Sequence, residues 1–460
     1  MRDEVIKTLR WLRQAFIRMS MSRLVTFGCN SKVPERNIAL GYLFYIIVGF
    51  VLIILPWSHR TGGYNLVDDF FTIVSAVSTT GLATVDVPAV YTPFGMTVIL
   101  LMIQTGAIGY MTVSSYIMLH LSRRMTDRSF RVMSSSLPVP QGVSMRSLVD
   151  NVVHFTFIFE LAGFVALWII FGSLGVDSPA WSALFISVSS FCTAGFSTFP
   201  DSLCAFQNNL PVNITVAALS FAGAMGFIVI TDLRNKCFDR RYRITFTTKV
   251  ILVMTLSLTL LGTVVLTVFP AADQSASLPV RVLESFFQTM SAMTTVGYNT
   301  FNLATLMPPA VLVLSVIMFI GASPSGTGGG VKCTTVSAVY AFVMSKLRGD
   351  RNVTLGGNRL PDYRINSALA NIIVYGTVLL AGVLLLVISE KFTLLQVLFE
   401  CASALGTVGV SLGITPELSV FGKFVIIALM YIGRIGVLTL GVALSPHALR
   451  TDRRQSDIAL

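Results

Sequence analysis

One short pattern occurs four times along the chain and constrains its fold more than any other feature of the sequence. In each copy a phenylalanine, a serine and a Thr-x-Gly tripeptide follow one another at the same spacing, so the copies align without a gap. The copies end at Gly81, Gly195, Gly297 and Gly409. This regular recurrence indicates four diverged repeats of one structural unit.

The chain between these copies is strongly apolar. Of its 460 residues, 54% are hydrophobic and 12% are charged, whereas about 25% are charged in a typical soluble domain. Nearly uninterrupted apolar runs occur at residues 38–55, 98–119, 250–268, 372–388 and 425–444. Each run is close to the ~20 residues that a helix needs to cross a bilayer. We therefore predict an all-α polytopic membrane protein.

The net charge of +11 has a topological explanation. Most of the 33 lysines and arginines lie in five segments, residues 1–36, 120–148, 233–249, 345–364 and 448–460. Because basic residues concentrate in cytoplasmic connections, we predict an inner-membrane protein with both termini in the cytoplasm. The basic segment 1–36 is expected to lie on the membrane lipid, and no nucleic-acid partner is indicated. The six cysteines and four histidines are scattered and indicate neither a metal site nor a disulfide framework.

Each repeat is predicted to contain a spanning helix, a short helix that ends at the repeated pattern, and a second spanning helix. The short segments, such as residues 67–79, have too few residues to span and should be re-entrant pore helices, buried in protein. The predicted fold has eight spanning helices and four pore helices around one pseudo-fourfold pore. The predicted segments are a basic N-terminal segment (1–36), repeat 1 (37–120), repeat 2 (148–232), repeat 3 (246–345), repeat 4 (366–445) and a cytoplasmic tail (446–460).

The Thr-x-Gly tripeptides suit an ion-selectivity filter, in which consecutive backbone carbonyls replace the hydration shell of a cation. Residues 295–298 read Thr-Val-Gly-Tyr, as in the filter of K⁺ channels. Glycine permits the backbone torsions that such a segment needs, and the threonine adds a hydroxyl ligand or a local hydrogen bond. The C-terminal end of each pore helix favours a cation. The predicted filter and K⁺ site comprises Thr79, Thr80, Gly81, Thr193, Ala194, Gly195, Thr295, Val296, Gly297, Thr407, Val408 and Gly409.

Other repeated positions have more general interpretations. The aligned phenylalanines and serines are interpreted as packing residues of the pore helices. Asp68 and Glu284 lie at equivalent positions and are expected to stabilise the N-terminal ends of their pore helices. Small-residue motifs at 106–109, 223–226 and 433–436 occupy the same place in repeats 1, 2 and 4, and they indicate close helix packing.

Repeat 3 lacks this motif and has residues 321–330 in its place. This stretch is rich in glycine and hydroxyl residues and contains a proline, so it is unlike a regular helix. We predict that the helix breaks here, in mid-membrane, and that the polar segment forms a gate. Arg434 lies in an otherwise apolar helix, where a charge is usually functional, either as a tether for the loop or as a limit on cation occupancy. Lys332 is close enough to the cytoplasm to snorkel. The predicted gate comprises Gly321, Ala322, Ser323, Pro324, Ser325, Gly326, Thr327, Gly328, Gly329, Gly330, Lys332 and Arg434.

These features resemble the Trk/Ktr/HKT superfamily of K⁺ transporters over nearly the whole chain, and most closely its Ktr-type membrane subunits. The resemblance rests on the four filter glycines, the glycine-rich break at 321–332 and the stretch 432–436. It implies a homodimer in which each protomer has its own pore, and a cytosolic ring of nucleotide-binding, RCK/KTN-type regulatory subunits. The complete set of four filter glycines implies a preference for K⁺ over Na⁺.

The leading hypothesis is K⁺ uptake through a carbonyl filter, with no organic cofactor in this chain. Na⁺ or mixed Na⁺/K⁺ permeation by the same architecture is the alternative, and the sequence leaves open whether Na⁺ or H⁺ accompanies K⁺ in symport. A secondary transporter for another solute commonly uses inverted repeats, whereas these four share one orientation. An enzyme would need a convergent set of titratable groups, and Glu160 and Glu400 are isolated in the sequence, so no catalytic residue is predicted.

Overall fold

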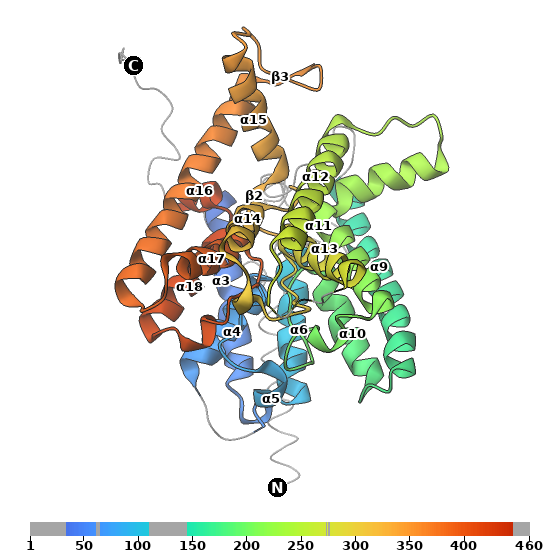
Figure 1. Ribbon diagram of the computed structural model, residues 1–460, viewed down its shortest axis with the longest axis vertical. Coiled ribbons are helices and arrows are strands. Elements are labelled where there is room, and N and C mark those ends of the chain that lie inside the picture. Colours follow the sequence, from blue (N-terminus) through green and yellow to red (C-terminus); the bar gives the residue numbers. More distant parts are fainter. Residues whose placement is uncertain (1–33, 61–64, 110–144, 273, 275–276, 445–460) are drawn as a thin grey trace, which may run out of the picture.

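The computed structural model describes residues 34–60, 65–109, 145–272, 274 and 277–444. Most of the basic segment 1–36, which is predicted to lie on the membrane lipid, falls outside the described residues, as do most of the connection between repeats 1 and 2 and the cytoplasmic tail 446–460. The structure is built mainly of α-helices, with two small two-stranded sheets in the described part (Figure 1).

The helices follow one another in four groups that correspond to the four copies of the repeated pattern. The first group contains α3 (Pro34–Ile53), α4 (Leu66–Val77), α5 (Val87–Val90) and α6 (Pro93–Ile108). The second contains α9 (Met145–Ser173), α10 (Pro179–Phe191) and α11 (Leu210–Phe238). The third contains α12 (Phe246–Val268), α13 (Leu278–Thr294), α14 (Pro308–Phe319), β1 (Ile320–Gly321), β2 (Val331–Lys332) and α15 (Cys333–Leu347). The last contains α16 (Asp362–Ser389), α17 (Leu394–Gly406), α18 (Val420–Ile435) and α19 (Val437–Leu444).

Five of the described helices are long and apolar enough to cross a membrane, namely α3, α9, α11, α12 and α16. A sixth span results if α18 and α19, which meet at an angle of 95°, are taken together. The two remaining predicted spans do not form continuous long helices in the described residues. One of them, α6, ends at Ile108, next to the undescribed residues, and the other is divided into α14 and α15 by residues 320–332.

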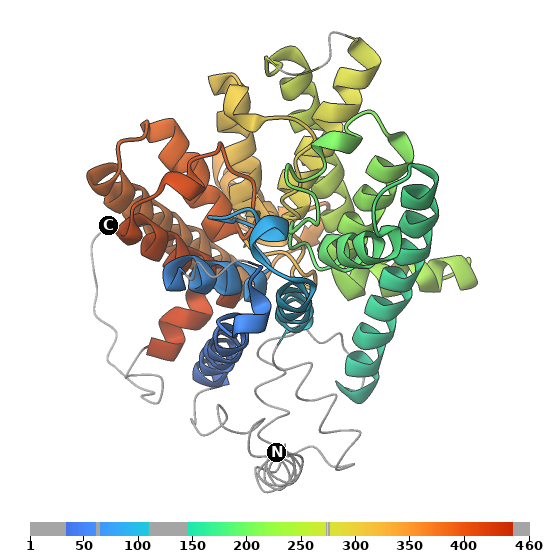
Figure 2. The same ribbon diagram turned by 90° about the horizontal axis from the view of Figure 1, so that it is seen from below.

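The four groups of helices form a closed circle of contacts (Figure 2). In each group, the helix at the start of the second predicted span packs against the short helix of the next group. The pairs are α6 with α10, α11 with α13, α14 with α17, and α18 with α4. The short helices α4, α10, α13 and α17 therefore lie toward the middle of the molecule. Each of them buries the phenylalanine of the repeated pattern almost completely, with Phe71, Phe185, Phe287 and Phe399 at most 1% exposed. The interpretation of these phenylalanines as packing residues is confirmed.

The outer helices present large apolar side chains to their surroundings. Ile169 of α9, Leu260 of α12 and Leu380 of α16 are each more than 65% exposed. A water-soluble surface rarely has so many exposed apolar residues on neighbouring helices. These faces suit contact with lipid, which agrees with the apolar lengths of the same helices.

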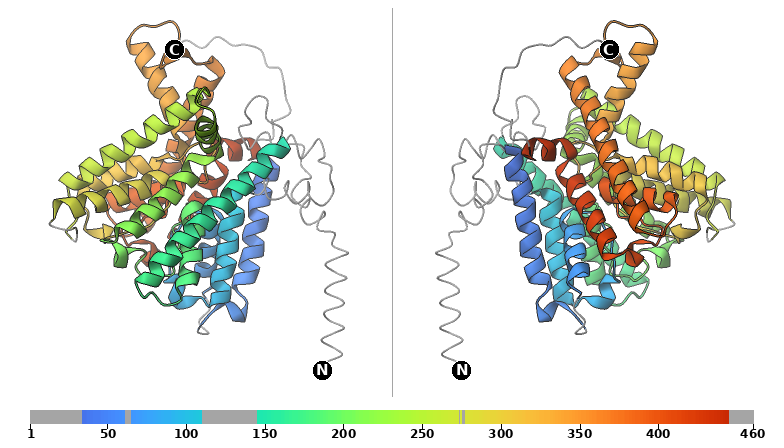
Figure 3. Two further views of the ribbon diagram at one scale, coloured as in Figure 1. Left: turned by 90° about the vertical axis from the view of Figure 1, so that its right-hand side faces the viewer. Right: turned by 90° about the vertical axis from the view of Figure 1, so that its left-hand side faces the viewer.

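At one end of the molecule α15 and α16 extend beyond the other helices (Figures 1 and 3). A short hairpin, β3 (Thr354–Leu355) and β4 (Asn358–Arg359), joins them. Its turn residues Gly356 and Gly357 have φ values of 54° and 79°, which glycine adopts without strain.

Candidate functional site

The four short helices end in the same way. Each ends in a threonine with left-handed φ, at 52° for Thr79, 51° for Thr193, 59° for Thr295 and 51° for Thr407. The N–H of the next residue donates to the carbonyl of the patterned serine over 2.8–3.0 Å in all four copies. This is the Schellman arrangement that usually has glycine at the left-handed position. A β-branched residue there is strained, and strain repeated four times points to a functional constraint on this turn.

The residues that follow, 79–81, 193–195, 295–297 and 407–409, are called here the Thr-x-Gly segments. Their glycines lie so close to the neighbouring segment that none leaves room for a side chain. A Cβ on Gly81 would lie 2.4 Å from the Ala194 carbonyl oxygen, and one on Gly195 would lie 2.3 Å from that of Val296. A Cβ on Gly297 would lie 2.3 Å from the Val408 oxygen, and one on Gly409 would lie 2.0 Å from the Thr80 oxygen. The fourth segment thus meets the first, and the four segments close a cycle of contacts.

The patterned serines hold these segments in place. Ser75 Oγ accepts a hydrogen bond from the Gly81 N–H at 3.0 Å, and Ser403 Oγ accepts one from the Gly409 N–H at 3.1 Å. In the other two copies the serine hydroxyl donates to the carbonyl after the glycine, at 2.9 Å for Ser189 and 2.7 Å for Ser291. The packing interpretation from the sequence was therefore incomplete, because these hydroxyls fix the backbone of the segments.

The acidic residues near the start of the short helices differ from each other. Asp68 lies in the first turn of α4, as predicted, and its Oδ1 is 2.7 Å from Lys423 Nζ of α18. The same prediction was wrong for Glu284, because α13 begins at Leu278 and has no acidic residue in its first turn. The prolonged start of α13 follows from Pro279, which is well tolerated at the beginning of a helix.

The glycine-rich stretch forms a loop between α14 and α15. A short parallel pairing of β1 with β2, Ile320 with Val331 and Gly321 with Lys332, brings the two ends of the loop together. The loop is attached to α11, since the Ser323 N–H donates to the Ala224 carbonyl at 3.2 Å and the Thr327 N–H donates to the Gly223 carbonyl at 3.1 Å. Residues 321–330, called here the central loop, thereby bridge the second and third groups of helices.

The central loop and Arg434 contact the threonine of every Thr-x-Gly segment. The hydroxyls of Thr193 and Thr327 are 3.0 Å apart, and the Gly329 N–H donates to Thr407 Oγ1 at 3.0 Å. A Cβ on Gly328 would lie 2.2 Å from Thr295 Oγ1, and Arg434 Nη1 donates to Thr79 Oγ1 at 2.9 Å. The loop therefore lies directly against one side of the circle of segments.

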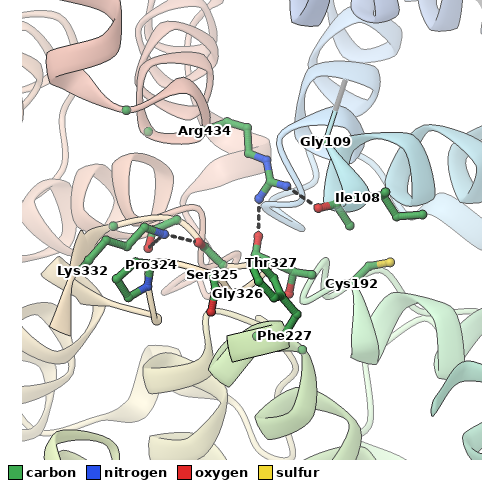
Figure 4. Close-up of a pocket in the computed structure, with 18 of the residues that line it drawn as sticks. Ile108, Gly109, Cys192, Phe227, Pro324, Ser325, Gly326, Thr327, Lys332 and Arg434 are labelled. Carbon is green, nitrogen blue, oxygen red and sulfur yellow. Dashed lines mark hydrogen bonds between the residues drawn. The ribbon is translucent and has the colours of Figure 1, made fainter. Parts of the chain in front are cut away.

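Arg434 joins three parts of the molecule through its guanidinium group (Figure 4). Nη1 donates to the Thr327 carbonyl of the central loop as well as to Thr79, and Nη2 donates to the carbonyls of Gly106 and Ala107 at the end of α6. A cation is favourable at the C-terminal end of a helix, where carbonyls lack helical partners. Arg434 lies in an apolar helix, as predicted, but the apolar run 425–444 is divided, because α18 ends at Ile435.

Comparison with known proteins agrees with this geometry. A family model described as "TrkH: Cation transport protein" matches residues 44–449. The chain belongs to the TrkH family of cation transport proteins. The resemblance proposed from the sequence is thereby confirmed.

The TrkH-family chain is similar to several curated proteins over most of its length. It is 34% identical to the Ktr system potassium uptake protein B of Vibrio alginolyticus, over 89% of this chain and 91% of that protein. It is 33% identical to the protein of the same name from Bacillus subtilis, over 88% and 92%. It is 29% identical to the potassium/sodium uptake protein NtpJ of Enterococcus hirae, over 91% and 94%. The crystal structure of the potassium transporter TrkH from Vibrio parahaemolyticus has the same fold, with a TM-score of 0.69, 20% identity, and coverage of 90% of this chain and 86% of that one.

The small-residue motifs at 106–109, 223–226 and 433–436 allow close helix packing, as predicted, and they also interrupt their helices. The first glycine of each motif packs closely, since a Cβ on Gly106 or Gly433 would lie 2.1 Å from a carbonyl oxygen of the adjacent short helix. The last glycine interrupts the helix, with φ values of 85° for Gly109, 73° for Gly226 and 92° for Gly436. Two features of the sequence could have indicated these helix ends: the equal spacing of the glycines in their repeats and the break predicted at the same place in repeat 3. The sequence interpretation took the glycines for packing residues alone.

A cavity of about 310 Å³ lies beside the central loop. Arg434, Lys332, Thr327 and Cys192 are among the residues that line it (Figure 4). Lys332 Nζ donates to the Gly328 carbonyl at 2.6 Å, so its ammonium group binds the loop. The interpretation of Lys332 as a snorkelling residue was wrong.

Proposed function

We propose that this chain takes up K⁺ across the cytoplasmic membrane through one pore formed by its four repeats. Eight spanning helices and four re-entrant pore helices, α4, α10, α13 and α17, build this pore. The Thr-x-Gly segments form its selectivity filter, in which the carbonyl oxygens replace the hydration shell of K⁺. The observation that carries the proposal is the cycle of contacts from Gly81 through Gly195 and Gly297 to Gly409 and back.

The central loop, Lys332 and Arg434 form the gate of this pore. In support, the loop packs against the threonines of the filter, where a K⁺ ion would have to leave. Opening requires the loop to withdraw from these threonines, and its hydrogen bonds to α11 and Arg434 hold it in place until then. The cavity is the space that the ion enters next.

The names of the relatives guide the remaining assignments. Because two relatives are named as parts of a Ktr system, we propose that this chain is a Ktr-type membrane subunit, a homodimer that works with a cytosolic nucleotide-binding ring. Both termini are cytoplasmic in this arrangement, as the distribution of basic residues favours. The membrane potential drives uptake, with about 2.3 kcal/mol per charge for each 100 mV.

Permeation of Na⁺ together with K⁺ is the second candidate function, because one relative is named a potassium/sodium uptake protein. Flux measurements on proteoliposomes with K⁺ alone and with Na⁺ alone separate the two functions. K⁺ uptake that exceeds Na⁺ uptake supports the first, and equal uptake supports the second.

The experiment for the filter is K⁺-limited growth of a bacterium that lacks its own K⁺ uptake systems. The wild-type chain should restore growth. Gly297→Ala should not, because its Cβ would meet the Val408 carbonyl at 2.3 Å. The matched control is Gly376→Ala on α16, where a Cβ would meet nothing within 4 Å, and it should restore growth fully. Equal growth with Gly297→Ala and Gly376→Ala would overturn the assignment of the filter.

A further inference from the structure

The cavity beside the central loop has an unexpected charge for a cation pathway. Its lining contains two basic side chains, Lys332 and Arg434, and no aspartate or glutamate among the described residues that line it. A cation that enters this cavity meets positive charge on its walls. Negative charge near the cavity would oppose this repulsion and favour K⁺ inside it.

Glu160 of α9 lies directly behind the cavity wall. Val152 and Thr156 occupy the same face of α9 at intervals of one helical turn, and both line the cavity. Glu160 is the next residue on this face and is only 9% exposed. Its Oε1 accepts a hydrogen bond from the Cys192 thiol at 3.5 Å. Cys192 lines the cavity and directly precedes the filter residue Thr193.

A second contact connects Glu160 with the end of α6. Gln104 Nε2 donates to Glu160 Oε2 at 3.1 Å, and Gln104 Oε1, which is 3.4 Å from Cys192 Sγ, shares the single thiol proton with Glu160. Gln104 lies two residues before Gly106, whose carbonyl binds Arg434. The carboxylate and the guanidinium group therefore both form hydrogen bonds near the C-terminal end of α6.

The charge of Glu160 is not neutralised by an ion pair in the described part of the chain. Ion pairs in that part join other residues, for example Lys423 to Asp68. A buried carboxylate is costly unless other charges compensate it, and an ionisable side chain within a membrane helix is usually functional. The two side chains that contact this carboxylate, Gln104 and Cys192, are not basic.

We propose that Glu160 sets the cation occupancy of the cavity by offsetting the positive charge of Arg434 and Lys332. This inference rests on the proposed function, since it requires K⁺ to pass through the cavity. Glu160 is a positioning residue that acts through its field and does not touch the ion, because Cys192 stands between them. Its backbone carbonyl accepts a hydrogen bond from Ser187 Oγ at 2.7 Å, and this link between α9 and α10 survives any change of the Glu160 side chain.

The test separates the effect of the charge of Glu160 from the effect of its size. K⁺ uptake into proteoliposomes is measured as a function of K⁺ concentration. Glu160→Gln keeps the size and removes the charge, and it should raise the half-saturating K⁺ concentration about tenfold. Glu160→Asp keeps the charge and should stay within about threefold of wild type. The control is Glu400→Gln, which removes a completely buried carboxylate that binds Ser411 and does not line the cavity. It should leave the half-saturating concentration unchanged.

A second variant keeps the proposal testable even if Glu160→Gln fails to fold. Thr156→Glu adds a carboxylate to the cavity wall with Glu160 in place, and it should lower the half-saturating K⁺ concentration. The proposal is overturned if Glu160→Gln behaves like wild type, if Glu160→Gln and Glu160→Asp are equally impaired, or if Thr156→Glu has no effect. Absence of K⁺ uptake by the wild-type protein would instead overturn the proposed function itself.

Discussion

Replacement of Arg434 by glutamine should increase K⁺ flux. In the structure one hydrogen bond of Arg434, to the Thr327 carbonyl, holds the central loop, while the others bind Thr79 and the end of α6. If the loop withdraws when the gate opens, only the closed state has this bond. A hydrogen bond to a charged group contributes about 1.5–3 kcal/mol. Its loss should therefore shift the gate toward the open state by about 10- to 150-fold.

The assay is Rb⁺ or K⁺ uptake into proteoliposomes under a fixed membrane potential, with the melting temperature of each variant measured in parallel. Arg434→Lys separates the two interpretations of this residue. It keeps the positive charge but lacks the planar group that reaches three parts of the molecule. A tether predicts high flux for both variants, whereas simple repulsion of cations predicts wild-type flux for Arg434→Lys.

A second control is Lys332→Gln. Lys332 binds the Gly328 carbonyl within its own loop, so its loss should change the flux much less than the loss of Arg434. The reasoning is refuted if a folded Arg434→Gln variant, with an unchanged melting temperature, carries the same flux as wild type or a lower one.

Three further predictions follow from the same contacts. Deletion of residues 323–329 should raise K⁺ flux because the gate is removed, and unchanged or lower flux in a folded protein would indicate a packing function. Ser403→Ala removes the acceptor for the Gly409 N–H. It should lower the unfolding free energy by about 1–3 kcal/mol and reduce the K⁺-over-Na⁺ flux ratio. No change in either quantity would contradict the function of Ser403 in holding the filter backbone. Lys423→Met leaves the Asp68 carboxylate without its ammonium partner at 2.7 Å; thermal unfolding should show a loss of about 3 kcal/mol, most of which Lys423→Arg should restore, and equal stability of all three proteins would contradict a structural ion pair.

The convergence of the Thr-x-Gly segments could be anticipated from the sequence because the pattern needs no gap in any copy. Identical spacing fixes the same turn between the end of each short helix and its glycine, so Gly81 and Gly409 have to occupy equivalent places. The left-handed threonines were not anticipated. Their conformation depends on hydrogen bonds from the following N–H to the patterned serines, and threonine alone gives no signal for it.

The break in the second helix of repeat 3 was predicted, but the breaks in the second helices of repeats 1, 2 and 4 were missed. Glycine inside an apolar helix is common in membranes, where it allows close packing, so Gly109, Gly226 and Gly436 gave no clear signal individually. Only at Gly226 does the break accompany a close tertiary contact, since a Cβ there would lie 2.1 Å from the Ser325 carbonyl oxygen, whereas a Cβ on Gly109 or Gly436 would meet no atom closer than 3.6 Å. The helix end next to Arg434 was missed as well, because α18 ends just before Gly436 and this glycine looked like a packing residue.

The cluster around Glu160 was beyond the reach of sequence reasoning. Its members, Gln104, Glu160 and Cys192, come from three different helices and are far apart along the chain. No spacing rule brings such residues together, and Glu160 accordingly looked isolated. Only the packing of α6, α9 and α10 places them side by side.

The most direct test of the central claim is the anomalous diffraction signal of crystals grown with Rb⁺ or Tl⁺ in place of K⁺. The account predicts anomalous density on the axis enclosed by the carbonyl oxygens of Thr80, Ala194, Val296 and Val408, and its loss in Gly297→Ala crystals. Ordered ions found elsewhere in the protein, with none between these four segments, would contradict it.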